Sequence, residues 1–256
     1  MKAFCFTVDD NIRFFRELTE KRPADMFEHP YLAMYRRLHE KFDLKVQLNL
    51  FYKEGVYDLT QMTDAYRSQW QENAHWLKMS FHSEWENVKP YEFSGYQEVY
   101  DHCKAVSDQI LRFAGPEVLG ETTTVHYCRT TNEGLDAMAD NGYKGLLGLF
   151  GTPEQPRCSY SAPEELCAKI REGELLPYRG VIMAPIDIVL NLFSAESILE
   201  QLENMKDRNQ INVMIHEQYF YPDYVAYQPE FEAKLDSTFS WFQSHGYESS
   251  FLQERI

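Results

Sequence analysis

Short apolar runs alternate with longer amphipathic stretches along most of the chain, and this alternation restricts the possible folds more than any other feature. The first run, residues 3–8 (AFCFTV), is rich in aromatic and branched side chains and ends at two aspartates, which is typical of a buried parallel strand. Between the runs, apolar residues recur at helical spacing, as in residues 63–76. Strand followed by helix, repeated about seven times, indicates a parallel α/β fold. Further apolar runs lie at residues 44–51, 76–81, 122–127, 144–150, 180–185, 211–215 and 246–252, and further amphipathic stretches at residues 95–114, 132–143, 195–206 and 228–246.

The number of repeats favours a barrel over an open sheet. We therefore expect a distorted (β/α) barrel of seven or eight parallel strands. No Pro-rich or low-complexity linker divides the chain, so we interpret residues 1–256 as a single domain. Residues 151–180 depart from the alternation and contain four prolines. We interpret them as a loop-rich insertion, with short strands, near the mouth of the barrel.

Charge and cysteine content exclude several classes of protein. Asp and Glu total 40 against 25 Lys and Arg, a net charge of -15 with no long basic run, which disfavours a nucleic-acid partner. No apolar run is long enough to span a membrane, and the N-terminal one is too short for a signal peptide, so we expect a cytoplasmic protein. The five cysteines include no CxxC pair, as expected of reduced thiols.

Asp9 and Asp10 stand where the first predicted strand ends. The carboxyl ends of parallel strands are where α/β proteins place their chemistry. Adjacent carboxylates repel one another. A divalent cation bound by one of them would relieve this repulsion and leave the other free as a base with a low pKa. The alternative is that one of the two caps a helix that starts near Asn11.

His82 follows the apolar run WLKMSF, and Glu86 lies four residues further on. If a helical turn begins at Ser83, the imidazole and the carboxylate can face one point. That combination suits a divalent transition metal. The alternative is a surface histidine beside a solvated acidic turn.

Two further histidines follow predicted strands. His216 comes after INVMI, and at the lip of a barrel strand it could act as a general acid near neutral pH. His126 in TTVHYCRTT lies at another strand end with Arg129 nearby, where it could supply a metal ligand or an oxyanion donor. Each histidine taken alone could equally be a buried ring bonded to a main-chain carbonyl. The ends of parallel barrel strands converge, however, so we expect one site containing Asp9, Asp10, His82, His126 and His216.

At these residues the chain resembles the polysaccharide deacetylases, also called NodB-like carbohydrate esterases. That family's first motif is Thr-Phe-Asp-Asp-Gly and its second is His-(Ser/Thr)-x-x-His; the matching segments here are TVDDN and HSEWE. The strand in GYKGL, the late strand ending in His216 and the terminal SWFQSHGYESSFLQE follow the family's order over nearly the whole chain. Glu86 replaces the last His of the second motif. Asn11 replaces a Gly, and Asn tolerates left-handed conformations. The Arg- and Pro-rich third motif has no clean match in HYCRTT, so Arg129 is given no role.

The resemblance implies a NodB-like barrel and a role for each matched residue. Asp9 matches the catalytic base, Asp10 and His82 match metal ligands, and His216 matches the general acid that protonates the leaving amine. Either Glu86 or His126 would complete the metal site. The divalent metal, zinc or a similar ion in this family, would polarise an amide or ester carbonyl and activate water.

These implications predict a metal-dependent hydrolase of a C–N (amide) bond. Its reaction would be the deacetylation of a small N-acylated substrate, which could be sugar-like. The expected cytoplasmic location argues against a cell-wall polymer as the substrate. The competing interpretation is a catalytically inactive barrel that binds a metal or a carbohydrate, although a pure binder needs no spare base such as Asp9. Hydrolysis of another bond, for example a phosphoester, is a further alternative. Four tyrosines could form an aromatic wall for the ligand or simply pack their loop: Tyr219, Tyr221, Tyr224 and Tyr227.

Overall fold

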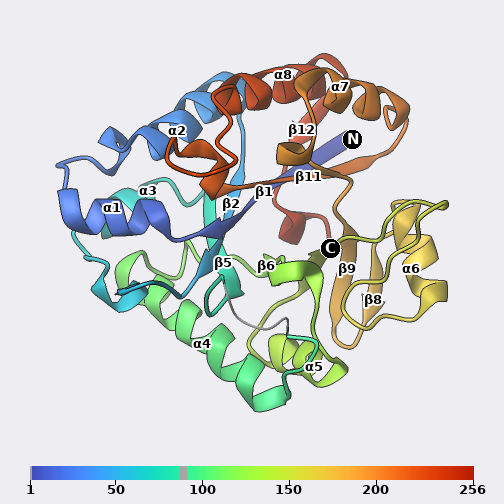
Figure 1. Cartoon of the computed structure of the whole chain (residues 1–256), viewed down its shortest axis with the longest axis horizontal. Helices are drawn as coiled ribbons and strands as arrows, with labels where there is room; N and C mark the ends of the chain where they lie inside the picture. Colours follow the sequence, from blue (N-terminus) through green and yellow to red (C-terminus); the bar gives the residue numbers. More distant parts are fainter. Residues whose placement is uncertain (1, 87–90) are drawn as a thin grey trace.

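Strand β1 (Lys2–Asn11) is the central element of the fold, and every residue in it after Lys2 is buried. The computed structural model describes residues 2–86 and 91–256 (Figure 1). In it, β1 pairs in parallel with β11 (Gln210–His216) on one side and with β2 (Val46–Phe51) on the other. Strand β5 (Leu77–Ser83) extends this sheet in parallel beyond β2. Burial on both faces explains why these strands are almost continuously apolar in sequence.

A second sheet continues the circuit of strands. Strands β6, β7 and β9 are parallel, β8 is an antiparallel edge on β9, and β10 returns to pair in parallel with β11. The bounds of these strands and of the remaining short ones are β3 (Lys53–Glu54), β4 (Tyr57–Asp58), β6 (Thr122–Thr123), β7 (Gly145–Gly148), β8 (Leu176–Tyr178), β9 (Val181–Pro185), β10 (Ile188–Val189) and β12 (Tyr247–Ser249).

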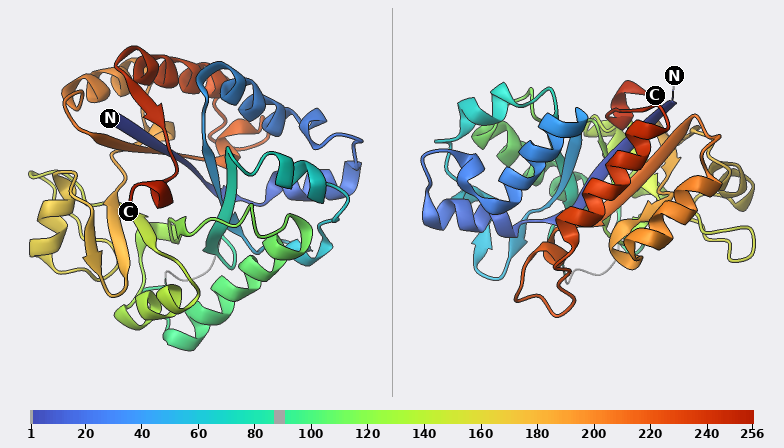
Figure 2. Two further views of the ribbon diagram at one scale, coloured as in Figure 1. Left: turned by 180° about the vertical axis from the view of Figure 1, so that it is seen from behind. Right: turned by 90° about the horizontal axis from the view of Figure 1, so that it is seen from above.

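Main-chain hydrogen bonds join the two sheets at both of their borders. From β5, the Met79 N–H donates to the Val118 carbonyl, ahead of β6, at 2.9 Å, and from the link between β9 and β10 the Asp187 N–H donates to the Asn212 carbonyl of β11 at 2.8 Å. Within the described residues, eight strands thus follow one another in chain order around a distorted barrel: β1, β2, β5, β6, β7, β9, β10 and β11 (Figure 2). The predicted α/β barrel fold is confirmed.

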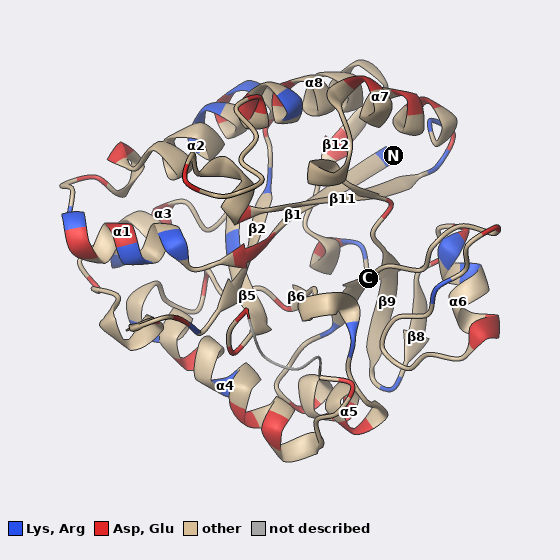
Figure 3. Cartoon of the chain, viewed as in Figure 1, with Lys and Arg blue, Asp and Glu red and all other residues tan. Residues whose placement is uncertain are grey.

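Helices cover the outside of this barrel. Helix α8 packs on β1, where Phe242 stacks on Phe4 with ring centroids 4.2 Å apart and Phe239 meets Phe6 edge-on. Lys and Arg are interspersed with Asp and Glu along the outer helices (Figure 3). None of the helices in the described ranges is both long and apolar enough to cross a membrane. Their bounds are α1 (Arg13–Lys21), α2 (Pro30–Phe42), α3 (Arg67–Glu72), α4 (Tyr96–Phe113), α5 (Asn132–Asp140), α6 (Glu164–Arg171), α7 (Ala195–Asn204) and α8 (Phe231–Ser244). Short 3-10 helices lie at Met26–Glu28, Leu59–Gln61, His126–Cys128, Leu190–Leu192, Glu217–Phe220 and Leu252–Glu254.

Two parts of the fold differ from the sequence prediction. Residues 246–252 contain β12, which pairs only with Lys2–Phe4 at the start of β1, while the eighth strand of the circuit is the two-residue β10. The segment at residues 151–180 contains helix α6, which was not predicted, in addition to loops and the short strand β8. Its helix begins directly after Pro163, a residue that often precedes or opens helices, so the prolines mark an element boundary here.

The N-terminus of α1 is capped by a carboxylate that is distant in the sequence. No side chain of the neighbouring residues caps this helix. The buried carboxylate of Glu217 accepts from the N–H groups of Ile12 at 2.7 Å, Arg13 at 3.0 Å and Phe14 at 2.7 Å. It therefore satisfies the donors that the first helical turn leaves unpaired, at the positive end of the helix dipole. The alternative in which Asp9 or Asp10 caps this helix is wrong, because Glu217 holds that position.

Replacing the cap tests its contribution to stability. We expect Glu217→Ala to lower the free energy of unfolding by about 3 kcal/mol, because three buried N–H groups lose their acceptor. Urea unfolding followed by circular dichroism measures the change. Glu20→Ala is the matched control on the same helix, where the side chain is exposed and the unfolding midpoint should stay unchanged. Equal midpoints for the two variants would contradict the capping role.

Candidate metal centre

A break in strand β1 brings both aspartates to one cavity. In a regular strand, Asp9 and Asp10 would point to opposite faces of the sheet. Asp10 instead has a left-handed backbone with φ 63°, and the register of β1 against β2 shifts between Val8 and Asn11. Such a bulge turns the following side chain, and as a result both carboxylates line the same cavity at the carboxyl ends of the strands.

The side chain of Asn11 holds this bulge. Its Nδ2 donates to the Val8 carbonyl at 2.6 Å and to the Asn49 carbonyl at 3.1 Å, and its Oδ1 accepts from the Tyr31 hydroxyl at 2.9 Å. Asn11 does not use the left-handed conformation that asparagine tolerates; Asp10 has that conformation instead. Asn11 bridges the main chain on both sides, which a glycine at this position cannot do.

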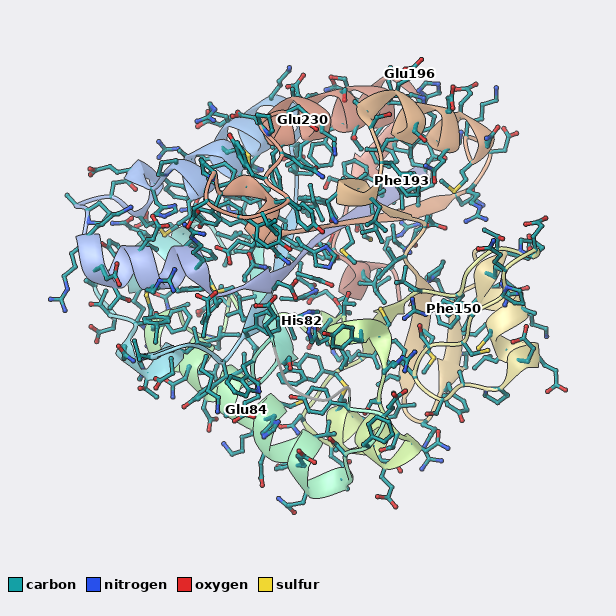
Figure 4. All side chains as sticks on the ribbon, in the orientation of Figure 1. His82, Glu84, Phe150, Phe193, Glu196 and Glu230 are labelled. Atoms are coloured by element: carbon teal, nitrogen blue, oxygen red, sulfur yellow. The ribbon has the colours of Figure 1, made fainter. Side chains whose placement is uncertain are left out.

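Three side chains from three strand ends form a tight triangle. Asp10 Oδ1 lies 3.0 Å from His82 Nε2 and 3.4 Å from His126 Nδ1, and the two ring nitrogens are 3.1 Å apart. Asp10 comes from β1, His82 from β5 and His126 from the turn after β6. Figure 4 shows His82 near the centre of the molecule. Although it is buried, Asp10 Oδ1 has no hydrogen-bond partner among the described residues.

Main-chain carbonyls orient both imidazole rings. His82 Nδ1 donates to the Thr124 carbonyl at 2.5 Å, and His126 Nε2 donates to the Glu86 carbonyl at 3.1 Å. In the neutral rings, the unprotonated nitrogens therefore face Asp10 Oδ1. Three acceptors pointing at one another are unfavourable unless a cation lies between them. The one-carboxylate, two-imidazole donor set, held from behind by hydrogen bonds, fits a divalent metal such as zinc.

Glu86 is placed differently from the sequence expectation. Strand β5 continues to Ser83, which pairs with Phe51, so the helical turn considered after His82 does not form. The carboxylate of Glu86 is not part of the triangle, and it is the main-chain carbonyl of this residue that contacts His126. Glu86 and His126 were the two residues considered as the third metal ligand, and the structure brings His126 to Asp10 and His82.

Asp9 lies beside the triangle with different chemistry. Its Oδ1 accepts from Asn49 Nδ2 at 2.6 Å, and its Oδ2 is 3.9 Å from His82 Nδ1. Burial, reinforced by the charge of Asp10, raises the pKa of Asp9 well above its ordinary value. Burial also opposes ionisation of Asp10, but without a metal the adjacent His126 and His82 rings, when protonated, donate to its carboxylate and hold the pKa of Asp10 well below its ordinary value. Two neighbouring carboxyl groups are thus separated into a weak acid and an anion.

His216 completes the group of candidate residues. It ends β11 directly opposite Asp9 in the β1–β11 register, and its Nε2 lies 4.0 Å from Asp10 Oδ2. Its Nδ1 donates to Asn191 Oδ1 at 2.8 Å, which leaves Nε2 facing the cavity, and burial lowers the pKa of this imidazole. Sequence reasoning missed Asn191, since the two-residue strand before it leaves little pattern. The strand-end residues that were expected to share one site all line this cavity: Asp9, Asp10, His82, His126 and His216.

The cavity at these residues has a volume of about 330 Å³. Of the four tyrosines considered as an aromatic wall, Tyr219 lines it, while Tyr224 lines a smaller neighbouring cavity of about 100 Å³. Tyr221 is buried and donates to Glu217, and Tyr227 is partly exposed. The rest of the lining comes from Glu86, Thr124, Val125, Tyr127, Cys128, Leu149, Arg157, Val189, Asn191, Leu192, Met214 and Gln218.

Solved structures with a similar fold come from proteins of more than one activity. A family 4 acetyl xylan esterase from Clostridium thermocellum, in complex with a cobalt ion, aligns with a TM-score of 0.55 at 12% identity, over 99% of this chain and 89% of that one. A putative polysaccharide deacetylase from Mycobacterium smegmatis aligns with a TM-score of 0.57 at 10% identity, again over 99% and 89%. A 4-alpha-glucanotransferase from Thermococcus litoralis aligns with a TM-score of 0.63 at 12% identity, over 99% of this chain and 40% of that one.

These similarities establish a shared fold. The resemblance to polysaccharide deacetylases read from the sequence is confirmed at that level. A glucanotransferase has a similar fold, so the fold alone does not decide the reaction. No family model matches the sequence, and no curated protein matches it.

The triangle can be tested by metal analysis. We expect near-stoichiometric zinc after incubation with the ion, and a loss of at least tenfold in affinity in His82→Ala, His126→Ala or Asp10→Asn, because each removes a donor atom. Elemental analysis and calorimetry give stoichiometry and affinity. Glu86→Ala is the control and should retain the metal, since its carboxylate lies outside the triangle. Metal lost in Glu86→Ala but kept in His126→Ala would reverse this assignment.

The bulge can be tested at Asn11. We expect Asn11→Gly to lower the free energy of unfolding by roughly 2 to 4 kcal/mol and to weaken zinc binding, because three buried hydrogen bonds that hold Asp10 are lost. Tyr31→Phe is the control, because it removes only one of these bonds and should cost about 1 kcal/mol. Unchanged stability and zinc affinity in Asn11→Gly would show that the bulge is held by other contacts.

Proposed function

We propose that this chain, on the fold it shares with polysaccharide deacetylases, is a metal-dependent hydrolase of a C–N (amide) bond. Its reaction is the removal of the acyl group from a small N-acylated substrate. The observation that carries this proposal is the triangle of Asp10, His82 and His126, with Asp9 and His216 beside it in one cavity. A metal alone would serve binding, whereas a metal flanked by a candidate base and a candidate acid serves hydrolysis.

Asp10, His82 and His126 would hold the divalent ion. Zinc is the first candidate, because two imidazoles and one carboxylate suit it. When bound, the ion would supply Lewis-acid polarisation of the acyl carbonyl and ease deprotonation of water. The three side chains come from separate strand ends, and the hydrogen bonds behind both rings keep their unprotonated nitrogens directed at the same point.

Asp9 acts as the general base in this proposal. It lines the cavity next to Asp10, and the Asn49 amide fixes one of its oxygens. Its raised pKa brings its affinity for a proton closer to what base catalysis near neutral pH needs, and the charge of a bound cation would keep it ionised. A protein that only binds a ligand has no use for this second buried carboxylate.

His216 acts as the general acid that protonates the leaving amine. Asn191 holds its Nδ1, so that Nε2 faces the cavity from the strand beside Asp9. The two candidate proton-transfer groups thus reach the cavity from neighbouring strands. This arrangement allows a water molecule to lose its proton on one side of the acyl carbon while the departing nitrogen gains one on the other.

The dimensions of the cavity favour a small substrate. A volume of about 330 Å³ lies near the lower end of ligand pockets. Apolar residues such as Leu149, Val189 and Met214 supply much of its wall, and Tyr219 adds one aromatic face, on which a sugar-like ring could pack. The partner is therefore a small molecule or carbohydrate. The cytoplasmic location expected from the sequence stays a prediction.

Two substitutions test the assigned roles. We expect Asp9→Asn and His216→Ala to lower kcat by about 10²- to 10⁴-fold with zinc retained, because each removes a proton-transfer group. Acetate release from small N-acetylated amino sugars and amino acids by the zinc-loaded protein gives the rate, and metal analysis gives the occupancy. Asp207→Asn is the control, because Asp207 is exposed and does not line the cavity, and this variant should keep the parent rate.

If Asp9→Asn released acetate at the parent rate, Asp9 would not be the general base. If the zinc-loaded parent released acetate from none of these compounds, the inactive binding barrel would be the better account.

A further inference from the structure

Among the described residues that line the cavity at Asp10, His82 and His126, Arg157 is the only Lys or Arg. Its Nη2 donates to the Tyr127 carbonyl at 3.0 Å, and no carboxylate of the described residues lies within ion-pair distance of its guanidinium. Several other arginines are ion-paired, for example Arg129 with Glu92 at 2.7 Å, while Arg67, like Arg157, donates to main-chain carbonyls. A guanidinium has five N–H donors in a fork that matches carboxylate or phosphate oxygens. Arg157 is exposed to solvent where it lines the cavity, and its remaining donors are accessible to a ligand.

The position of Arg157 is set by contacts of its loop. Its main-chain N–H donates to the Phe150 carbonyl at 3.0 Å, directly after β7, and Gly151 forms an antiparallel bridge with Pro156. The Tyr127 carbonyl that its side chain contacts belongs to the turn that carries His126. Tyr127 has a left-handed backbone with φ 62°, a strained conformation of the kind that occurs at functional sites. The guanidinium is therefore tied to the turn that carries one of the candidate metal ligands.

Charge is unevenly distributed around the cavity. Asp9, Asp10 and Glu86 are acidic, and Glu86 also lines the smaller neighbouring cavity together with Glu54. Arg157 does not contact that second cavity. An anionic group is repelled on the acidic side and attracted at Arg157, in a chain whose net charge is -15.

Two further polar atoms in the cavity have no protein partner. Asn191 Nδ2 and Thr124 Oγ1 are buried, line the cavity and make no hydrogen bond with the described residues. Asn191 is 5% exposed and Thr124 is 1% exposed, so bulk water does not compensate for the missing bonds. A polar ligand that enters the cavity supplies these partners.

We infer that the substrate carries an anionic group, a carboxylate or a phosphate, that pairs with Arg157 while its acyl group faces Asp10, His82 and His126. This inference rests on the proposed function and narrows its substrate class to N-acylated anions. Arg157 is then the residue that selects charged substrates over neutral ones of the same shape.

The test compares matched neutral and anionic substrates on the zinc-loaded protein. One pair is N-acetylglucosamine and its 6-phosphate, and the other is N-acetylalanine amide and N-acetylalanine. We expect the parent to prefer an anionic member by about 10- to 100-fold in kcat/KM, as one charged hydrogen-bonded pair allows. The preferred pair distinguishes phosphate from carboxylate.

In Arg157→Gln the preference should fall to within about twofold of equality, and in Arg157→Lys it should be retained in part. Arg129→Gln is the matched control, because this arginine is already paired with Glu92, and the parent preference should persist. Metal content measured in each variant shows whether the turn at His126 is intact. An unchanged preference in Arg157→Gln, or a parent that prefers the neutral members, would overturn the inference.

Failure of the proposed hydrolysis is distinguishable from failure of this inference. If no compound is hydrolysed, calorimetry with the same four compounds measures binding to the zinc-loaded protein. Binding of an anionic member that weakens about tenfold in Arg157→Gln supports the inference without the reaction. Binding that is equal in parent and variant, or undetectable for both anionic members, overturns it.

Discussion

The left-handed break of β1 at Asp10 is the constraint on which the rest of the site depends. A residue other than glycine in this conformation costs on the order of 1–3 kcal/mol, so surrounding contacts must hold it. Asn11 bonds the main chain before and beside the break, and Glu217 bonds the N–H groups that follow it. Without the break, Asp9 and Asp10 would face opposite sides of the sheet, and one cavity could not contain both the candidate metal ligand and the candidate base.

Much of the fold and part of the site follow from sequence pattern. Buried parallel strands leave apolar runs whose ends converge, which is why Asp10, His82 and His216 can be grouped from their positions in the sequence. Features that depend on distant contacts leave no local pattern. The cap on α1 comes from Glu217, and the choice of His126 over Glu86 depends on how a turn after β6 is directed. Asn191 was missed for another reason, because the two-residue strand before it is too short to leave a recognisable apolar run.

The two adjacent carboxyl groups illustrate how burial and neighbours divide one chemical type into two roles. Asp10 lies against two imidazoles and its pKa is held low, while burial and the charge of Asp10 raise the pKa of Asp9, whose carboxyl accepts from the Asn49 amide. The shared fold with an esterase and a glucanotransferase shows that the barrel itself is compatible with several reactions. A few side chains at the strand ends therefore decide which reaction such a barrel supports. The outer helices contribute least to that choice.

The pairing of β1 with β11 also has a consequence for the order in which the molecule is assembled. Strand β1 leaves the ribosome well before its neighbour Gln210–His216 and the carboxylate of Glu217, which lie about 200 residues further along the chain. Contacts with such a large separation close late and slow folding. During synthesis this buried central strand therefore waits without one of its partners, exposed to chaperones and to aggregation, until β11 appears.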